Sequence, residues 1–284
     1  VDVVDTIFAW GGTIDAKVIR TTNGGANWVQ TSSALGGEVT AISGINNQRS
    51  VVIVNNSAST RIRRTVSGGV SWSTVYEDSS TDAHLNAITM LDDMNGYAIG
   101  DPVNGQWVIL KTTDGGLNWD PTSTLSQNGS EKGISNSMKW VDLMNGWFGT
   151  DNSRIYRTTD GGITWAAGVT TFQNSNTVAF TDVSGGVTAG VDINWSTDGG
   201  ASWFTKPAQI SGEITSAASA EQIQGKYFFV TGNEVYSTNN FGDSFVLGYS
   251  QTDTLRSIDV DVVKVGENNW ITGYAVGDSG RITK

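Results

Sequence analysis

The chain has 284 residues, no cysteine and a formal net charge of −11, from 17 basic and 28 acidic side chains. The absence of cysteine excludes disulfide bonds and thiolate metal sites, and the acidity opposes binding to nucleic acid or anionic membranes. We find no apolar run of membrane-spanning length and no signal peptide. We therefore expect no nucleic-acid partner, no membrane insertion and no cofactor.

One short phrase recurs along the chain, and every copy ends in an aromatic residue. The third copy reads Thr112-Thr-Asp-Gly-Gly-Leu-Asn-Trp119. In chain order the copies end at Trp28, Trp72, Trp119, Trp165 and Trp203, with a longer, altered sixth copy ending at Phe245. Repeats of roughly 40–50 residues are typical of solenoids and propellers.

Each repeat contains the pattern of four short strands. In the third repeat, apolar runs at 87–91, 97–100 and 107–111 are separated by turn residues, and a fourth run begins at Trp119. The pattern predicts an all-β, seven-bladed β-propeller of four-stranded antiparallel blades. We expect 1–284 to be a single propeller domain, with repeats near 1–30, 38–76, 85–123, 134–167, 176–206, 213–247 and 255–284.

The phrase is interpreted as a structural turn between the third and fourth strands. Its glycine pair permits positive φ, and the polar residue before that pair accepts hydrogen bonds within the turn. Ser67 accepts less well than Asp, so its turn should be looser. The aromatic residue should be buried between sheets. The structural positions are Asn23, Trp28, Ser67, Trp72, Asp114, Trp119, Asp160, Trp165, Asp198, Trp203 and Phe245.

The phrase resembles the Asp-box (BNR) repeat, Ser/Thr-x-Asp-x-Gly-x-Thr/Ser-Trp. The segments Asn95-Gly-Tyr-Ala-Ile-Gly-Asp101 and Thr272-Gly-Tyr-Ala-Val-Gly-Asp278 extend the likeness. Together they are similar to the photosystem II stability/assembly-factor family of propellers and its secreted bacterial relatives. The resemblance extends over nearly the whole chain, but a propeller fold hosts many unrelated activities.

The seventh repeat is expected to be incomplete. Strands are predicted near 257–260, 271–276 and 281–284, and no phrase follows them. One interpretation is that the chain belongs to a longer protein with further domains beyond Lys284. We prefer it because an unpaired strand edge is usually avoided. The other is a final blade of three strands.

Four carboxylates follow the predicted second strands and are candidate ligand-binding residues. They are Asp101, Asp151, Asp192 and Asp278. They could form an acidic ring that binds a cation or a basic partner, on the face opposite the phrase turns. The alternative is that each Asp caps its own tight turn, which is the usual role of such residues.

Three other residues and one connection complete the candidate binding set. His84 precedes the third inner strand, but it lacks His or Cys neighbours and so predicts no metal site. Trp107 and Trp140 could stack on a sugar or anchor a protein. The long connection over 122–134 is our first candidate for a partner contact.

Two hydrolase classes need sets of residues that can be sought in this sequence. A sialidase needs three convergent arginines, whereas Arg20, Arg64 and Arg157 each precede a phrase and so form a repeated position. A glycosidase needs two carboxylates. Acidic candidates are Glu77, Asp78, Asp82, Glu131 and Asp182, but no motif marks a pair. We assign no catalytic residue.

The preferred function is a non-enzymatic, exported or cell-surface bacterial propeller. It would bind a protein or a glycan through the face opposite the phrase turns, as a module of a larger protein or alone. One alternative is a glycoside hydrolase with an unmarked carboxylate pair. Another is an assembly factor for a membrane complex, as the family resemblance implies.

Overall fold

The computed structural model describes residues 1–31, 34–207, 210–221, 223–265, 268–278 and 282–284. These residues form 27 strands. Within these ranges the structure contains no helix long and apolar enough to span a bilayer. The chain divides into two compact units, one comprising residues 1–136 and 160–164 and the other residues 137–159 and 165–284.

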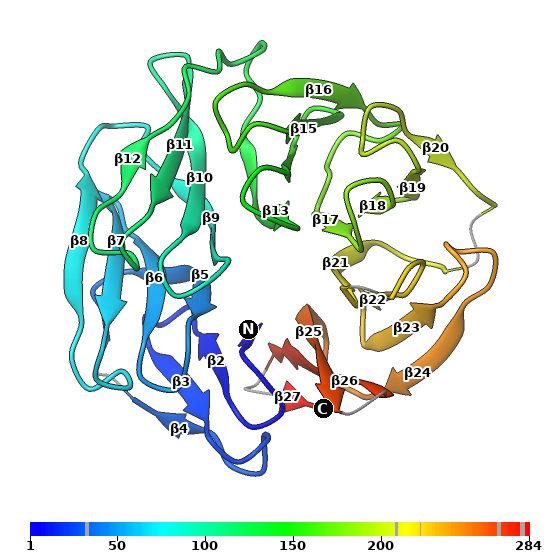
Figure 1. The fold of residues 1–284 in the computed structure, drawn as a ribbon, viewed down its shortest axis with the longest axis horizontal. Coiled ribbons are helices and arrows are strands. Elements are labelled where there is room, and N and C mark those ends of the chain that lie inside the picture. The colour runs from blue at the N-terminus through cyan, green and yellow to red at the C-terminus, as the bar shows by residue number, and fades with distance from the viewer. Residues whose placement is uncertain (32–33, 208–209, 222, 266–267, 279–281) are drawn as a thin grey trace. The chain divides into compact units, whose positions relative to one another are not determined.

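The strands form antiparallel sheets, and each sheet consists of strands that are consecutive in the chain (Figure 1). We number these sheets blade 1 to blade 7 in chain order. Blades 1 to 3 belong to the first unit. Their strands are β1 (Asp2–Val3), β2 (Ala9–Gly12), β3 (Val18–Thr21) and β4 (Val29–Gln30); β5 (Glu38–Gly44), β6 (Ser50–Asn55), β7 (Thr60–Thr65) and β8 (Ser73–Asp78); β9 (Leu85–Met90), β10 (Gly96–Val103), β11 (Gln106–Thr112) and β12 (Asp120–Pro121).

Blade 4 begins in the first unit, and blades 5 to 7 lie in the second. Their strands are β13 (Gly133–Trp140), β14 (Gly146–Thr150), β15 (Arg154–Thr158) and β16 (Ala166–Val169); β17 (Thr177–Phe180), β18 (Gly186–Ala189), β19 (Ile193–Ser196) and β20 (Phe204–Thr205); β21 (Ile214–Ser219), β22 (Tyr227–Thr231), β23 (Glu234–Thr238) and β24 (Val246–Ser250); β25 (Leu255–Val265), β26 (Asn268–Gly277) and β27 (Ile282–Thr283). The predicted all-β, seven-bladed propeller is confirmed, and its last blade has three strands.

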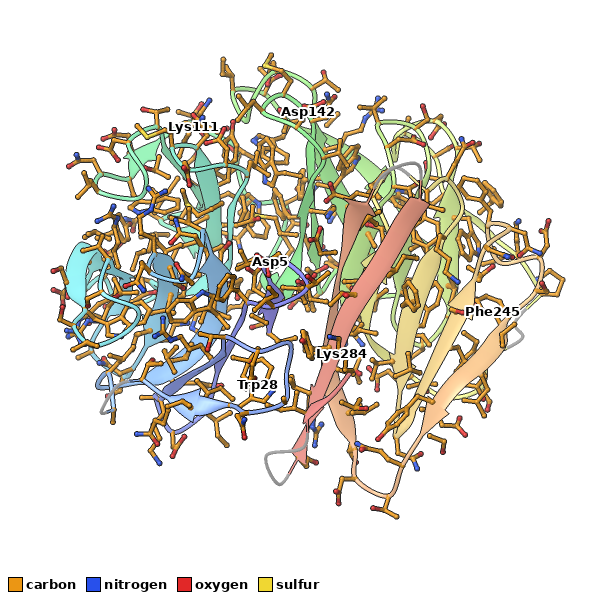
Figure 2. The ribbon with its side chains drawn as sticks, turned by 60° about the horizontal axis from the view of Figure 1, so that its bottom comes forward. Asp5, Trp28, Lys111, Asp142, Phe245 and Lys284 are labelled. Carbon is orange, nitrogen blue, oxygen red and sulfur yellow. The ribbon has the colours of Figure 1, made fainter. Side chains whose placement is uncertain are left out.

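The burial of each strand depends on its place in the blade. The second strand of blade 2, β6, is buried along its whole length, whereas the third strand, β7, alternates buried Thr60 and Ile62 with half-buried Arg61 and Arg63. Figure 2 shows the side chains on the strands. Because stacked blades cover both faces of an inner strand, such strands read as continuous apolar runs rather than alternating ones.

The phrase forms the turn predicted for it. In the third copy, Gly115 and Gly116 have φ of 74° and 79°, and Asp114 Oδ1 accepts hydrogen bonds from the N–H groups of Leu117 and Asn118, each 3.0 Å long. In the second copy Ser67 accepts one backbone bond, from Ser71 at 3.0 Å. The aspartate thus holds its turn with more bonds than the serine does.

The leading hydroxyl of the phrase has a role that the sequence did not reveal. Thr112 Oγ1 accepts a 2.9 Å hydrogen bond from Gly116 N and donates a second, 2.9 Å, to Asp114 Oδ1. The first of these bonds recurs in other copies, at Thr21, Thr65, Ser196 and Thr238. Threonine or serine therefore leads the phrase because its hydroxyl closes the turn around the second glycine.

The phrase aromatic packs between its own blade and the preceding one. Trp119 of blade 3 is 5% exposed and shares a cluster with Val51 of blade 2 and Leu85 of blade 3. The same placement is seen for Trp72, Trp203 and Phe245. Trp119 is buried, whereas Trp72, Trp203 and Phe245 are partly buried against their clusters. The phrase therefore supplies both a turn and an aromatic residue that packs against the core.

Candidate functional site

Each blade presents two different ends. At one end, the phrase turn lies against the turn between the first and second strands, as shown by hydrogen bonds from Gly68 N to Gln48 O (2.9 Å) and from Gly115 N to Met94 O (2.8 Å). We call this the phrase end. The opposite end, called the loop end, carries the turns between second and third strands and the connections from blade to blade. The predicted ligand-binding carboxylates follow the second strands and so belong to the loop end.

Asp101 is a buried structural residue rather than an open acidic group. It is 7% exposed, and its Oδ1 accepts hydrogen bonds from Asn86 Nδ2 at 2.7 Å and from Gly133 N at 2.9 Å. The Lys132 ammonium lies 3.8 Å from Oδ2. The carboxylate therefore joins blade 3 to the first residue of blade 4. Asp101 is therefore neither an open member of an acidic ring nor a residue that caps its own turn, which were the two roles considered from the sequence.

Other blades make a joint at or beside the same position. The end of the second strand, or the residue after it, bonds to the start of the next blade's inner strand. The bonds are Asn55 Nδ2 to Leu85 O (2.9 Å), Ser175 N to Thr150 O (3.1 Å), Ile214 N to Gly190 O (2.8 Å) and Leu255 N to Gly232 O (2.8 Å). This repeat position is thus used mainly to connect consecutive blades.

The remaining three carboxylates have separate local surroundings. Asp192 Oδ1 accepts a hydrogen bond from the N–H of Ile193 at 2.8 Å. Asp278 binds both Arg256 Nε (3.0 Å) and Nη2 (2.9 Å), and the hydrogen bond from Arg256 lowers the pKa of this carboxyl. Asp151 is half-buried and takes part in further interactions. In the described ranges, no cluster of three His, Cys, Asp or Glu side chains could hold a metal ion.

His84 belongs to a blade joint. Its backbone carbonyl accepts a 2.7 Å hydrogen bond from Asp101 N, and its Nε2 lies 3.4 Å from the Nδ2 of Asn55. The side chain is half-buried. The imidazole therefore lies against Asn55, the last residue of β6, at the joint between blades 2 and 3.

Trp107 and Trp140 are unsuited to the binding role considered for them. Both are 2% exposed, and Trp140 packs edge-on against Trp165 with ring centres 5.9 Å apart. A buried indole presents no ring face to a sugar or a protein. The prediction fails for these two residues because both side chains are buried in the core, Trp140 from the inner strand β13 and Trp107 from the third strand β11.

The long connection over 122–134 is ordered by its contacts with blade 3. Trp107 N donates to Leu125 O (2.9 Å) and Gln127 N to Gly105 O (2.9 Å). The carboxylate of Glu131, 1% exposed, accepts a 2.9 Å bond from Asn128 N. The exposed tip over 128–130 remains a candidate for partner contact.

The arginines before the phrases hold neighbouring turns. Arg64 Nε donates to Gly115 O at 2.7 Å, and Arg157 Nη1 donates to Asp198 O at 3.1 Å. Each thus reaches the phrase of the next blade. This is the repeated structural position that the sequence predicts, and it is distinct from a clamp of three converging guanidinium groups.

The acidic candidates for glycosidase chemistry also have structural partners. Glu77 pairs with Arg61 at 2.8 Å, and that hydrogen bond lowers its pKa, whereas a general acid needs a raised one. Asp78 and Asp182 accept backbone bonds from Ser80 and Ser184, at 2.8 and 2.7 Å. Asp82 is exposed. These contacts do not mark a catalytic pair.

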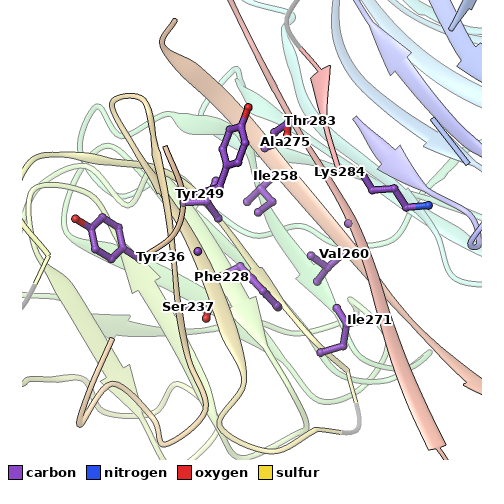
Figure 3. Close-up of a pocket in the computed structure, with 13 residues that line it drawn as sticks. Phe228, Tyr236, Ser237, Tyr249, Ile258, Val260, Ile271, Ala275, Thr283 and Lys284 are labelled. Atoms are coloured by element: carbon purple, nitrogen blue, oxygen red, sulfur yellow. The ribbon is translucent and has the colours of Figure 1, made fainter. Parts of the chain in front are cut away.

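A cavity that was not predicted from the sequence lies between blades 6 and 7. Its volume is about 270 Å³. Figure 3 shows Phe228 of blade 6 on one side and Val260 and Ile271 of blade 7 on the other. Its walls are ordinary strand residues, and no motif in the sequence marks them.

The sequence and the fold were compared with known proteins. Residues 53–177 match the family model described as photosynthesis system II assembly factor YCF48. No curated protein sequence matches the chain. Two similar solved structures are YCF48 bound to D1 peptide (15% identity, TM-score 0.71, covering 99% of this chain and 90% of that one) and YCF48 from Cyanidioschyzon merolae (15%, 0.69, 98% and 91%).

An enzyme also shares the fold. The GH74 enzyme of Niastella koreensis is 14% identical with a TM-score of 0.69, and the match covers 97% of this chain and 51% of the enzyme. At such identities the structural likeness concerns the fold alone. The family model adds a match in sequence over blades 2 to 4. The predicted resemblance is therefore confirmed: the chain is a BNR-type repeat β-propeller that resembles the photosystem II assembly-factor family.

Proposed function

We propose that this propeller is a protein-interaction module that binds a polypeptide segment of its partner. The observation that carries the proposal is the sequence match of residues 53–177 to an assembly-factor family. It is supported by the likeness to a propeller of that name bound to a peptide. A rigid scaffold that presents loops is suited to such recognition.

The partner's chemistry follows from the charge of the chain. With a net charge of −11, the protein attracts basic or neutral segments and repels acidic ones. An assembly role for a membrane complex is one form of this function, in which the segment belongs to a membrane protein. A soluble or cell-surface partner is the other, and both need the same recognition of an extended chain.

We further propose that the protein works outside the cytoplasm, at the cell surface or beyond. The cysteine-free composition and the low charged fraction of 16% are compatible with that location. Fractionation of the source cells with an antibody against residues 1–284 tests it. Recovery in the cytoplasmic fraction would contradict it.

Glycan binding and glycan hydrolysis are the competing functions, because a GH74 enzyme has a similar fold. The match covers nearly all of this chain and about half of the enzyme. They are separated from peptide binding by one parallel experiment. Immobilised residues 1–284 are exposed to a displayed library of random twelve-residue peptides and to a glycan array. A second aliquot is incubated with soluble polysaccharides, and released reducing sugar is measured.

We expect the library to yield enriched peptides that bind with micromolar dissociation constants. Shuffled versions of these peptides should not bind. Binding only to glycans, or release of sugar, would overturn the proposal. A library without enriched members would overturn it as well.

A further inference from the structure

Five asparagines in the chain are followed directly by glycine. The pairs are Asn23-Gly24, Asn95-Gly96, Asn104-Gly105, Asn128-Gly129 and Asn145-Gly146. Such a pair can modify itself, because the backbone nitrogen of the glycine can attack the side-chain amide carbon of the asparagine, and glycine has no Cβ to hinder the approach. The reaction needs a side-chain amide that is free to turn and a glycine nitrogen that is not held in a hydrogen bond.

Two of the pairs are held at turns between first and second strands. Asn95 Nδ2 donates to both carboxylate oxygens of Asp92, at 3.0 and 2.8 Å. Asn145 Nδ2 makes the same two bonds to Asp142, at 3.0 and 2.9 Å. The glycine that follows each of them begins a buried strand, β10 or β14. The amide and the backbone are therefore both fixed in these two pairs.

The pair in the first phrase is held by its own turn. Asn23 Oδ1 accepts hydrogen bonds from Thr21 Oγ1 at 3.0 Å and from Asn27 N at 2.9 Å. The N–H of Gly24 donates to Ile7 O at 2.9 Å. The nitrogen that would attack is already engaged, so the bonds that build this phrase also protect Asn23.

The pair Asn104-Gly105 is exposed but lies in a tight turn. The two residues have φ of 53° and 77°, and they connect β10 to β11 directly after the paired Val103 and directly before its partner Gln106. Closure of a five-membered ring requires rotation about the Cα–C bond of Asn104. The paired strands on either side resist that rotation, so this pair should react slowly.

The pair Asn128-Gly129 lacks these restraints. Both residues lie at the exposed tip of the connection over 122–134, and a Cβ at Gly129 would meet nothing within 4 Å. Within the described ranges, neither the Asn128 side chain nor the Gly129 nitrogen takes part in a hydrogen bond. The Asn128 N–H is bonded to Glu131 Oε1 at 2.9 Å. The chain is thus anchored just before the reacting groups, which are themselves free to approach.

We propose that Asn128 is a site of spontaneous covalent modification, in which its side chain condenses with the backbone of Gly129. The Gly129 nitrogen forms a bond to Cγ of Asn128, its proton passes through water to Nδ2, and Nδ2 leaves as ammonia. Water then opens the resulting succinimide. Opening at one carbonyl gives aspartate, and opening at the other gives isoaspartate, in which the main chain runs through Cβ and Cγ.

The modification changes the surface of the tip. Either product carries a carboxylate at position 128 that is ionised at neutral pH, so a chain that is already acidic gains a further negative charge. Isoaspartate also lengthens the main chain at this point. The chemistry belongs to this chain alone and goes beyond the proposed function, although it alters a segment that is a candidate for partner contact.

The test is incubation of folded residues 1–284 at about pH 8, followed by digestion with trypsin and mass spectrometry. The tryptic peptides 21–49, 65–111, 112–132 and 140–154 together contain all five pairs, and fragment ions locate each conversion. We expect Asn128 to convert about 10-fold faster than Asn104, which corresponds to about 1.4 kcal/mol in the activation barrier. The three hydrogen-bonded pairs should convert more slowly still.

Two controls separate the effect of the fold from that of the sequence. In a concentration of urea that unfolds the chain, all five pairs should convert at similar rates, because each has the same two residues. Asn128→Gln should abolish the conversion in peptide 112–132 and leave the other peptides unchanged, because a glutamine side chain would have to close a larger ring. The folded rate should also fall between about pH 8 and about pH 6, since the attacking nitrogen must lose its proton.

Equal rates for Asn128 and Asn95 in the folded chain would overturn the proposal. The same order of rates in the folded and the unfolded chain would overturn it as well, because the fold would then not select the site. A rate that does not depend on pH would contradict attack by the Gly129 nitrogen. None of these outcomes bears on the proposed peptide binding, which the displayed library tests separately.

Discussion

Asp101 Oδ1 accepts a 2.9 Å hydrogen bond from the backbone N–H of Gly133, which joins the second strand of blade 3 to the inner strand of blade 4. The same oxygen binds the side-chain amide of Asn86 at 2.7 Å. A carboxylate that sequence patterns offer as a ligand is therefore a connector between blades. Its substitution should affect stability, and this is the first prediction.

Asp101→Ala should lower the free energy of unfolding by about 1–3 kcal/mol, because it leaves the buried side-chain amide of Asn86 and the half-buried N–H of Gly133 without their acceptor. Urea denaturation measures the change. Asp82→Ala is the control, since Asp82 is an exposed aspartate at the same end of blade 3 and its loss should change stability by less than about 0.5 kcal/mol. Equal effects of the two substitutions would show that the joint does not depend on Asp101.

Asp114 should make the stability of the protein depend on pH in the acid range. Hydrogen bonds to this carboxylate, led by that from Asn118 N, lower its pKa from 3.8 to about 2. Because the folded pKa is below the unfolded one, the stabilisation is complete above pH 4 and is lost as the pH falls toward 2. With allowance for solvent exposure, the contribution is about 1 kcal/mol.

The difference in unfolding free energy between pH 5 and pH 2 measures this contribution. We expect it to be smaller in Asp114→Asn than in the unsubstituted chain. An unchanged pH dependence in the variant would contradict the assigned role of the Asp114 carboxylate.

Two glycines with similar backbone angles should respond differently to alanine. Gly116 and Gly105 have φ of 79° and 77°. A Cβ at Gly116 would lie 2.9 Å from Val51 of the preceding blade, whereas one at Gly105 meets nothing within 4 Å. Gly105→Ala should cost about 1–2 kcal/mol for the backbone alone, and Gly116→Ala more. Thermal denaturation compares them, and equal losses would mean that packing against Val51 is not limiting.

Removal of a phrase aromatic should destabilise the fold strongly. Trp119→Ala is expected to cost about 3–5 kcal/mol, because the ring fills the boundary between blades 2 and 3. Leu117→Ala in the same turn is the matched control, since Leu117 is 53% exposed and its truncation should have little effect. A small loss for Trp119→Ala would contradict the view that this ring holds adjacent blades together.

The sequence predicts the architecture because the device that builds each blade is local. Two glycines, a polar acceptor and an aromatic residue within eight positions specify a turn and a buried ring, as Gly115, Asp114 and Trp119 show. The number of repeats then predicts the number of blades. Even the three-stranded last blade is visible, as a third strand near Lys284 without a phrase after it.

The candidate site could not be predicted to the same depth because it depends on neighbouring blades. The partner of Asp101, Gly133, is 32 residues away along the chain and supplies only a backbone N–H, which no sequence pattern marks. Trp107 and Trp140 look like surface anchors until both faces of their strands are known to be covered. The cavity arises from two adjacent sheets, and its walls are ordinary strand residues such as Val260.

The central claim is that this propeller recognises a polypeptide segment. Calorimetric titration of the best peptide from the displayed library into residues 1–284, at two temperatures, tests it most directly. We predict saturable 1:1 binding at micromolar concentration with a negative heat-capacity change, as expected when apolar surface is buried. No saturable heat at either temperature, from a protein that melts cooperatively, would contradict the claim.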